Sequence, residues 1–124
     1  MLLVDKPAGM TSHDVVQYVR RIYGERSIGH LGTLDPFATG LLVLLLGRAT
    51  RLANFLDIEP KVYEATLGFG AETDTDDSTG TVIRTSAPPS ETDVRSALPS
   101  LTGTISQIPP AYSAKTVDGT RAYA

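Results

Sequence analysis

Residues 29–46 read GHLGTLDPFATGLLVLLL, a glycine-rich loop that runs directly into six consecutive aliphatic residues. The glycines and Pro36 argue against a helix across the loop, whereas the run 41–46 is typical of a buried strand. The loop carries one imidazole, His30, and one carboxylate, Asp35. Loops anchored by a rigid scaffold are where catalytic groups concentrate. An aspartate is an anion at neutral pH, so Asp35 needs no neighbouring base to act as a nucleophile.

The same residues also have ordinary structural explanations. An Asp-Pro pair between glycines is common in turns, where the Asp side chain caps backbone amides and Pro fixes φ. A loop histidine is a hydrogen-bonded structural residue about as often as it is a functional one. A strand tyrosine such as Tyr63 commonly packs its ring in a core. These residues alone leave both a plain turn and a catalytic loop open.

Composition bounds the class of protein. The chain has 124 residues, of which 41% are hydrophobic, and this is enough for one modest domain with a core. No apolar run approaches the roughly 18–20 residues of a membrane span, and the first residues lack a signal-peptide pattern, so we expect a cytoplasmic protein. The chain has no cysteine and two histidines, which excludes disulfides and thiolate zinc sites and argues against a catalytic metal.

Charge is distributed unevenly along the chain. The formal net charge of −3 is unfavourable for binding nucleic acid. Residues 1–56 nevertheless carry six Lys or Arg against four acids, whereas residues 57–93 carry two basic residues and nine acids. We therefore expect any RNA to approach the N-terminal half, away from the acidic loop 72–77. Ordinary solvated surfaces would show the same distribution.

Hydrophobic periodicity predicts a single α+β unit. We expect helices between a cap at 11–12 and Gly24, at 48–56 with Leu52 and Ala53 facing inward, and near 91–98, and strands at 2–4, 41–46, 61–70, 81–85 and 102–108. Tyr63 falls on the mainly apolar face of the strand 61–70. A polar turn at 74–80 would join two antiparallel strands, so we expect a mixed, mainly antiparallel sheet with flanking helices.

Four segments together resemble the TruB family of tRNA pseudouridine synthases, whose eukaryotic and archaeal relatives include dyskerin. They are VDKPAGMTS at 4–12, GHLGTLDPFATGLLVLLLGRATRL at 29–52, KVYEA at 61–65, and the segment 109–123, which contains PPAYSA. The segments follow the family's order and cover nearly the whole chain. Such a combination is much more specific than any one segment.

The resemblance implies a pseudouridine synthase-like catalytic domain, an isomerase that converts uridine-55 in the TΨC loop of tRNA into pseudouridine. In that family the aspartate matched by Asp35 attacks the uridine, at C1′ of the ribose or at C6 of the base. The tyrosine matched by Tyr63 stacks on uracil and accepts the C5 proton, and the histidine matched by His30 helps to displace the base from its stack. The reaction involves no net redox change or hydrolysis, so no cofactor is implied.

Other residues are expected to support this site. Lys6 would neutralise nearby charge or contact RNA phosphate, unless it is simply a solvated lysine at the end of a strand. Structural support is expected from residues of the first, second and last matching segments: Pro7, Gly32, Thr33, Leu34, Tyr112 and Ser113.

The family's pattern continues beyond what residues 1–124 match. It includes an RNA-gripping insertion, a strand whose arginine pairs with the catalytic aspartate and, in many members, a C-terminal RNA-binding PUA domain. We therefore interpret residues 1–124 as a partial catalytic domain, incomplete at the C-terminus and inactive alone. We expect a monomer that binds the TΨC stem-loop of tRNA and needs neither metal nor membrane. The alternative is a non-catalytic RNA-binding or tRNA-folding module with the same fold.

Overall fold

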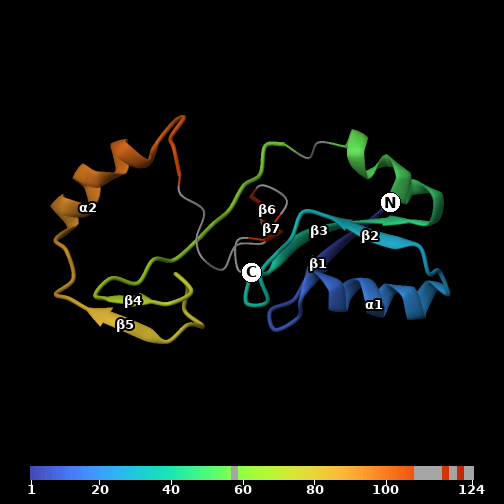
Figure 1. The fold of residues 1–124 in the computed structure, drawn as a ribbon, viewed down its shortest axis with the longest axis horizontal. Coiled ribbons are helices and arrows are strands. Elements are labelled where there is room, and N and C mark those ends of the chain that lie inside the picture. The colour runs from blue at the N-terminus through green and yellow to red at the C-terminus, as the bar shows by residue number, and fades with distance from the viewer. Residues whose placement is uncertain (57–58, 108–115, 118–119, 122–124) are drawn as a thin grey trace. The chain divides into compact units, whose positions relative to one another are not determined.

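The computed structural model describes residues 1–56, 59–107, 116–117 and 120–121, and Figure 1 shows its helices and strands. The chain divides into two compact units, residues 1–63 and 64–124. Within the described ranges, no helix combines the length and apolar character needed to span a bilayer.

The first unit is built around a three-stranded antiparallel sheet. The strands β1 (Leu2–Lys6) and β2 (Ile28–Leu31) both pair with β3 (Gly40–Leu46), which gives the order β1-β3-β2. Residues 42–45 of β3 are all buried, as expected for a continuous aliphatic run at the centre of a sheet. The strands predicted at 2–4 and 41–46 are therefore confirmed. Residues 29–31 were expected in the loop, but β3 offers them a pairing edge and, with Ile28, they form β2.

The helix α1 (Ser12–Tyr23) packs beside this sheet (Figure 1), and both of its ends have local causes. The Thr11 hydroxyl accepts a hydrogen bond from the Asp14 amide at 3.0 Å, and the Asp14 carboxylate accepts one from the Thr11 amide at 2.9 Å. This reciprocal arrangement is a capping box. Gly24 ends the helix in the left-handed conformation, with φ of 63°. The predicted cap and the predicted C-terminal glycine are both confirmed.

The core of the first unit lies between α1 and the sheet. Its buried side chains are Val15, Val16, Val19, Ile28, Leu42 and Leu44. Partly buried side chains pack against this cluster, and one of them, Leu34, comes from the loop between β2 and β3. The residue that precedes Asp35 is thus anchored in the core.

The segment after β3 differs from the prediction. Residues Gly47–Phe55 form a 3-10 helix, η1, in which no residue is buried, so the expected inward face with Leu52 and Ala53 is wrong. A 3-10 helix has about 3.0 residues per turn, so apolar residues spaced for an α-helix do not gather on one side.

The strand predicted at 61–70 is also wrong. Residues 61–69 are exposed and have no ladder partner within the described parts of the chain. Alternating side chains show only that a segment could cover a core, whereas a strand also needs a neighbour for its backbone hydrogen bonds. Residues 102–107 likewise form no strand, and residue 108 lies outside the described residues.

The second unit contains short elements. β4 (Ala71–Thr73) pairs with β5 (Val82–Thr85), and α2 (Glu91–Ala97) is followed by η2 (Leu98–Leu101). These confirm the strand near 81–85 and the helix near 91–98. The polar turn at 74–80 does join two antiparallel strands, but the first of them is β4 and not the predicted strand 61–70. β6 (Thr116–Val117) pairs with β7 (Thr120–Arg121). All strand pairs in the described ranges are antiparallel and fall in three separate sheets, so these residues do not form the mixed sheet that we expected. The combination of strands with helices confirms the α+β class.

Candidate functional site

The loop between β2 and β3 presents Asp35 to solvent. Gly32 has φ of 78°, a conformation that favours glycine, and the Ala38 amide donates to the Asp35 carbonyl at 3.1 Å. The Asp35 side chain is exposed, and no hydrogen bond to its carboxylate forms within the described residues. The Asp35 side chain therefore does not cap backbone amides within the described residues, and the plain-turn alternative is wrong on this point. The turn is closed by backbone atoms, and the carboxylate stays available.

Lys6 holds the residue that follows Asp35. Its side chain is fully buried, and its Nζ donates to the carbonyls of Pro7 at 2.9 Å, Met10 at 2.7 Å and Pro36 at 3.3 Å. The Gly9 amide donates to the same Pro36 carbonyl at 2.7 Å. The N-terminal segment is thus joined to the Asp35 loop at Pro36.

This burial corrects the expected contact between Lys6 and RNA phosphate. An ammonium group has three N–H donors, and in this structure three carbonyls accept from it. The solvated-lysine alternative is wrong for the same reason. Lys6 has a supporting role, which it shares with Pro7 through the carbonyl of that residue.

Ser12 holds the residue that precedes Asp35, and the sequence analysis missed it. Its hydroxyl accepts from the Leu34 amide at 3.0 Å and donates to the Leu34 carbonyl at 3.2 Å. The sequence signal that could have identified Ser12 is the pair of adjacent hydroxyl residues, Thr11 and Ser12, at the start of the helix. An N-cap uses only one hydroxyl side chain. The second hydroxyl was free for a contact distant in sequence.

His30 lies on β2, directly opposite Leu44 of β3, and is half-buried. Its Nδ1 donates to the carbonyl of Gly32 at 2.5 Å, which ties the ring to the start of the loop. A carbonyl can only accept, so Nδ1 carries the proton and Nε2 is the remaining ring nitrogen. The ring is therefore oriented by the loop that carries Asp35.

Tyr63 is not joined to this group in the described residues. Its side chain is 71% exposed and belongs to the irregular segment 61–69, so the expected apolar strand face around it is absent. Gly32 and Thr33 lie in the loop as expected, and Thr33 is exposed. Tyr112 and Ser113 lie outside the described residues. The structure thus brings together the loop and the segment 6–12, but not the phenol of Tyr63.

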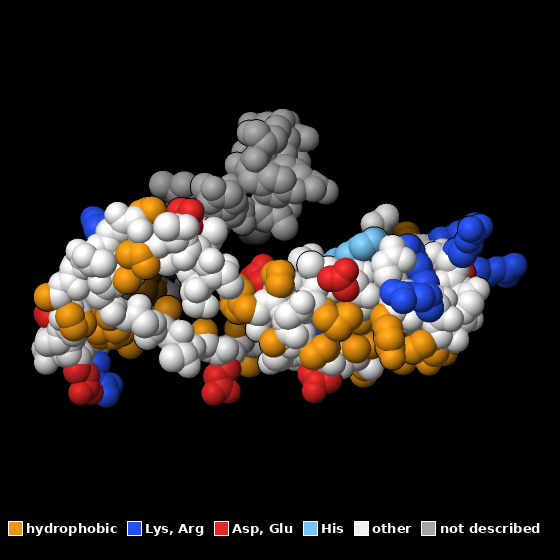
Figure 2. All heavy atoms as spheres, turned by 90° about the horizontal axis from the view of Figure 1, so that it is seen from below, with side chains coloured by type: hydrophobic (Ala, Val, Ile, Leu, Met, Phe, Trp, Pro, Cys, Tyr) orange, Lys and Arg blue, Asp and Glu red, His pale blue; other side chains and the backbone are white. Residues whose placement is uncertain are grey.

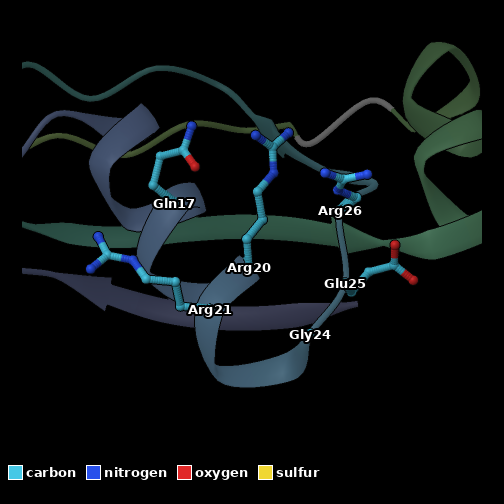
Figure 3. A pocket seen from close by; sticks show the side chains of 6 residues that line it. All are labelled: Gln17, Arg20, Arg21, Gly24, Glu25 and Arg26. Atoms are coloured by element: carbon cyan, nitrogen blue, oxygen red, sulfur yellow. The ribbon is translucent and has the colours of Figure 1, made fainter.

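A separate polar pocket of 460 Å³ lies at the C-terminal end of α1 (Figure 3). Its lining includes three arginines, Arg20, Arg21 and Arg26, together with Gln17, Gly24 and Glu25. In Figure 3 the side chains of Arg20 and Arg26 extend in the same direction, whereas that of Arg21 extends away from them. Figure 2 shows Lys and Arg side chains gathered at one end of the first unit.

The arginines of this pocket have little to neutralise them. Among the described residues none of the three forms a salt bridge, and the buried Nε of Arg20 has no hydrogen-bond partner. Arg20 Nη2 donates to the Ile28 carbonyl at 3.1 Å. Glu25, the acid in the lining, accepts from the Ser27 amide at 2.7 Å. The pocket therefore favours an anion, and the described residues hold no group of acids or histidines suited to a metal.

Comparison with known proteins identifies the family. The family model for TruB family pseudouridylate synthase (N terminal domain) matches residues 20–124, which is most of the chain. The chain belongs to the TruB family. This confirms the resemblance seen in the four sequence segments.

Relatives of this family match nearly the whole chain. The tRNA pseudouridine synthase B of Mycobacteroides abscessus is 50% identical over 125 residues, which cover 99% of this chain and 42% of that protein. The proteins of the same name from Thermobifida fusca and Paracoccus denitrificans are 51% and 53% identical and are covered to 43% and 41%. The TruB chain described here thus spans less than half the length of these relatives.

One solved structure is also similar over part of the chain. It is described as the structure of an H/ACA RNP bound to a substrate RNA containing 2′-deoxyuridine. The match has 43% sequence identity and a TM-score of 0.41, and it covers 44% of this chain and 18% of that chain.

The capping box of α1 makes the stability of the first unit depend on pH. The hydroxyl and then the amide of Thr11 donate to the Asp14 carboxylate and hold its pKa below the ordinary value. Because the pKa of Asp14 is lower in the folded state than in the unfolded state, its carboxylate stabilises the folded state fully above about pH 4. This contribution is lost as the pH falls through the folded-state pKa of Asp14. In Asp14→Asn an oxygen acceptor remains but the charge does not. We expect the difference in unfolding free energy between wild type and variant, from urea denaturation, to shrink below about pH 4. A difference independent of pH would contradict this account.

Replacing Lys6 tests its supporting role. Lys6→Met keeps an unbranched side chain but leaves the carbonyls of Pro7, Met10 and Pro36 without their donor. We expect urea denaturation to show a loss of about 1–3 kcal/mol in unfolding free energy. Lys61→Met is the control, because Lys61 is exposed and pairs with Glu59 at 3.3 Å, and its effect should stay within about 0.5 kcal/mol. Equal losses in the two variants would show that the three bonds of Lys6 contribute little.

Proposed function

We propose that the complete protein is a tRNA pseudouridine synthase that converts uridine-55 of the TΨC loop into pseudouridine, with Asp35 as the nucleophile. The family match and relatives about 50% identical that are named tRNA pseudouridine synthase B support this activity. The observation that carries the chemistry is the state of Asp35. Its carboxylate is exposed and accepts no hydrogen bond within the described residues, while Leu34 and Pro36 on either side are held.

The proposed reaction rearranges one substrate. The Asp35 carboxylate forms a bond to C1′ of the ribose or to C6 of the uracil, and the bond between C1′ and N1 breaks. Uracil turns and C5 forms the new bond to C1′. After attack at C1′, C5 displaces the carboxylate from C1′ as this bond forms. After attack at C6, the carboxylate stays bonded to C6 until the C5 proton leaves, when the bond between the carboxylate and C6 breaks and the C5=C6 double bond forms again. The proton on C5 leaves to a base and N1 gains a proton, so the substrate and product have the same composition and no co-substrate is needed.

Two other residues complete the proposal. Tyr63 stacks on the uracil and accepts the C5 proton, a role in which its exposed ring and hydroxyl must meet the everted base. His30 assists displacement of the base from its stack, which costs a few kcal/mol that new contacts must offset. Its Nδ1 is already bound to the Gly32 carbonyl, so the proposed contact with RNA uses the other edge of the ring.

The arginine pocket supports RNA as the partner. Arg20 follows Ser12 by eight positions on α1, which places the pocket about 12 Å along the helix from the contact with the Asp35 loop. The arginines lack salt bridges within the described residues, and phosphate contacts by Arg supply most of the affinity for nucleic acids. The pocket and the carboxylate are thus separated enough for binding and chemistry to be tested apart.

The second candidate is a non-catalytic RNA-binding or tRNA-folding module. It is favoured by one observation, that Asp35 forms no salt bridge with an arginine within the described residues. Release of label from the C5 position of uridine distinguishes the two candidates.

The activity test uses the complete protein and a tRNA transcript labelled with tritium at C5 of uridine. Wild type should release tritium, and Asp35→Asn should lower the rate by at least about 1,000-fold because the nucleophile is lost. His30→Ala, on the adjacent strand β2, serves as the control and should lower the rate much less, because this residue assists base displacement. Binding of tRNA by wild type without release of label would favour the non-catalytic module. Equal losses in both variants would instead give His30 a chemical role.

The arginine pocket is tested by the salt dependence of binding. The double variant Arg21→Gln and Arg26→Gln should bind tRNA more weakly, and the slope of log K against log salt should fall by about 1 for each lost phosphate contact. Arg95→Gln is the control, because Arg95 lies in the second unit and pairs with Glu91 at 2.8 Å. An unchanged slope in the double variant would remove this pocket from the RNA interface.

A further inference from the structure

We propose that Ser12 is a positioning residue that fixes the place of Asp35 through the backbone of Leu34. The inference rests on the proposed function for its catalytic meaning, since Asp35 is the nucleophile there. The contact itself is independent of that function. Ser12 is 3% exposed, and its hydroxyl bonds both polar backbone groups of one residue, Leu34.

A serine hydroxyl is suited to this double contact because it donates one hydrogen bond and accepts others. Oγ accepts from the Leu34 amide at 3.0 Å and donates to the Leu34 carbonyl at 3.2 Å. In a sheet, a neighbouring strand supplies such a pair of bonds through its backbone. Leu34 lies outside β2 and β3, so a side chain from α1 performs this role.

The helix does not need the Ser12 hydroxyl for its own cap. Thr11 is the N-cap residue, and its side chain and that of Asp14 complete the capping box. The two adjacent hydroxyls therefore have different roles, since Thr11 caps the helix and Ser12 binds the loop. Removing the Thr11 hydroxyl therefore tests the stability of the helix, and removing the Ser12 hydroxyl tests the position of the loop.

The bond to the Leu34 carbonyl acts directly on Asp35. That carbonyl belongs to the planar peptide unit that ends at the Asp35 Cα. A hydrogen bond that holds the carbonyl oxygen therefore fixes the orientation of this peptide plane and the position of the Asp35 Cα. Leu34 is also packed against the core cluster. On the other side, the Pro36 carbonyl accepts from Gly9 and Lys6. The Asp35 carboxylate thus stays free of hydrogen bonds within the described residues, between two neighbours whose backbones are held.

Loss of the hydroxyl should affect the chemical step more than binding. A nucleophile must lie within about 3–3.5 Å of the atom it attacks, and a misplacement of about 1 Å costs roughly 100-fold in rate. Ser12 is buried beneath the loop, so it offers no surface for phosphate contacts. A residue that only stabilised the fold would not produce this split between rate and affinity.

The kinetic test measures single-turnover pseudouridine formation and tRNA affinity for the complete protein. In Ser12→Ala the rate constant should fall by about 10- to 100-fold, whereas the dissociation constant should stay within about twofold of wild type. Ser12→Thr keeps a hydroxyl and should recover most of the rate. Thr11→Ala is the matched control, since it removes the cap but no contact with Leu34, and its rate should stay within about twofold. A rate for Ser12→Ala equal to that of Thr11→Ala would overturn the proposal.

A second measurement needs neither RNA nor activity. Amide hydrogen exchange at Leu34, followed by NMR, should be faster by about tenfold or more in Ser12→Ala and unchanged in Thr11→Ala. If wild type forms no pseudouridine, the proposed function fails while the exchange rate still decides whether Ser12 holds the loop. If wild type is active but exchange at Leu34 does not respond to Ser12→Ala, the positioning role is wrong and the proposed function stands.

Discussion

The hydrogen bonds from the segment 6–12 to Leu34 and Pro36 are the contacts on which the candidate site depends. They join residues 22, 27 and 30 positions apart and use two buried side chains, Ser12 and Lys6, as well as the Gly9 amide. The loop contributes the carbonyls of Leu34 and Pro36 as acceptors and the Leu34 amide as a donor. Backbone polar groups of this kind are costly when buried and unpaired. Because the loop is held through its backbone, the Asp35 carboxylate is not needed to hold it. A turn closed by its own aspartate would have used the oxygens that the proposed chemistry requires.

Cations in the first unit have two different roles, and burial separates them. Lys6 is enclosed by three carbonyls and acts on the loop, whereas Arg21 and Arg26 are exposed at the far end of α1. A net charge counted along the chain cannot make this distinction. The basic excess of residues 1–56 therefore overstates the charge available to RNA by the buried Lys6. Three of the five arginines in this range line the pocket at the end of α1, whereas Arg48 and Arg51 do not. Affinity and positioning of the nucleophile are thus assigned to opposite ends of one helix.

The sequence predicted the elements whose causes are local. The Thr11 and Asp14 pair and Gly24 set the ends of α1, and the aliphatic run 41–46 indicated β3, because each signal lies within the element itself. It did not predict the burial of Lys6, since the three carbonyls around Nζ are brought together only by the fold. Nor did it predict that residues 61–69 lack a ladder, because alternation describes the side chains and not the availability of a partner. The composition of the loop made Asp35 a candidate but left a plain turn open, and the family resemblance assigned catalytic roles to Asp35 and Tyr63.

The contrast between Asp35 and Tyr63 indicates how the site is assembled. Asp35 is placed by contacts that all lie within the first unit. This part of the site can therefore be ready before any substrate arrives, as electrostatic and nucleophilic groups require. Tyr63 is exposed and has no such contacts within the described residues. Its proposed role is to contact the base itself, and the everted uracil offers an aromatic face on which a phenol ring can stack. In this arrangement the carboxylate is held rigidly, and the tyrosine gains its position from the substrate. Catalysis would then depend on eversion of the nucleotide, because only the everted base reaches the Asp35 carboxylate and gives the Tyr63 ring a surface on which to stack.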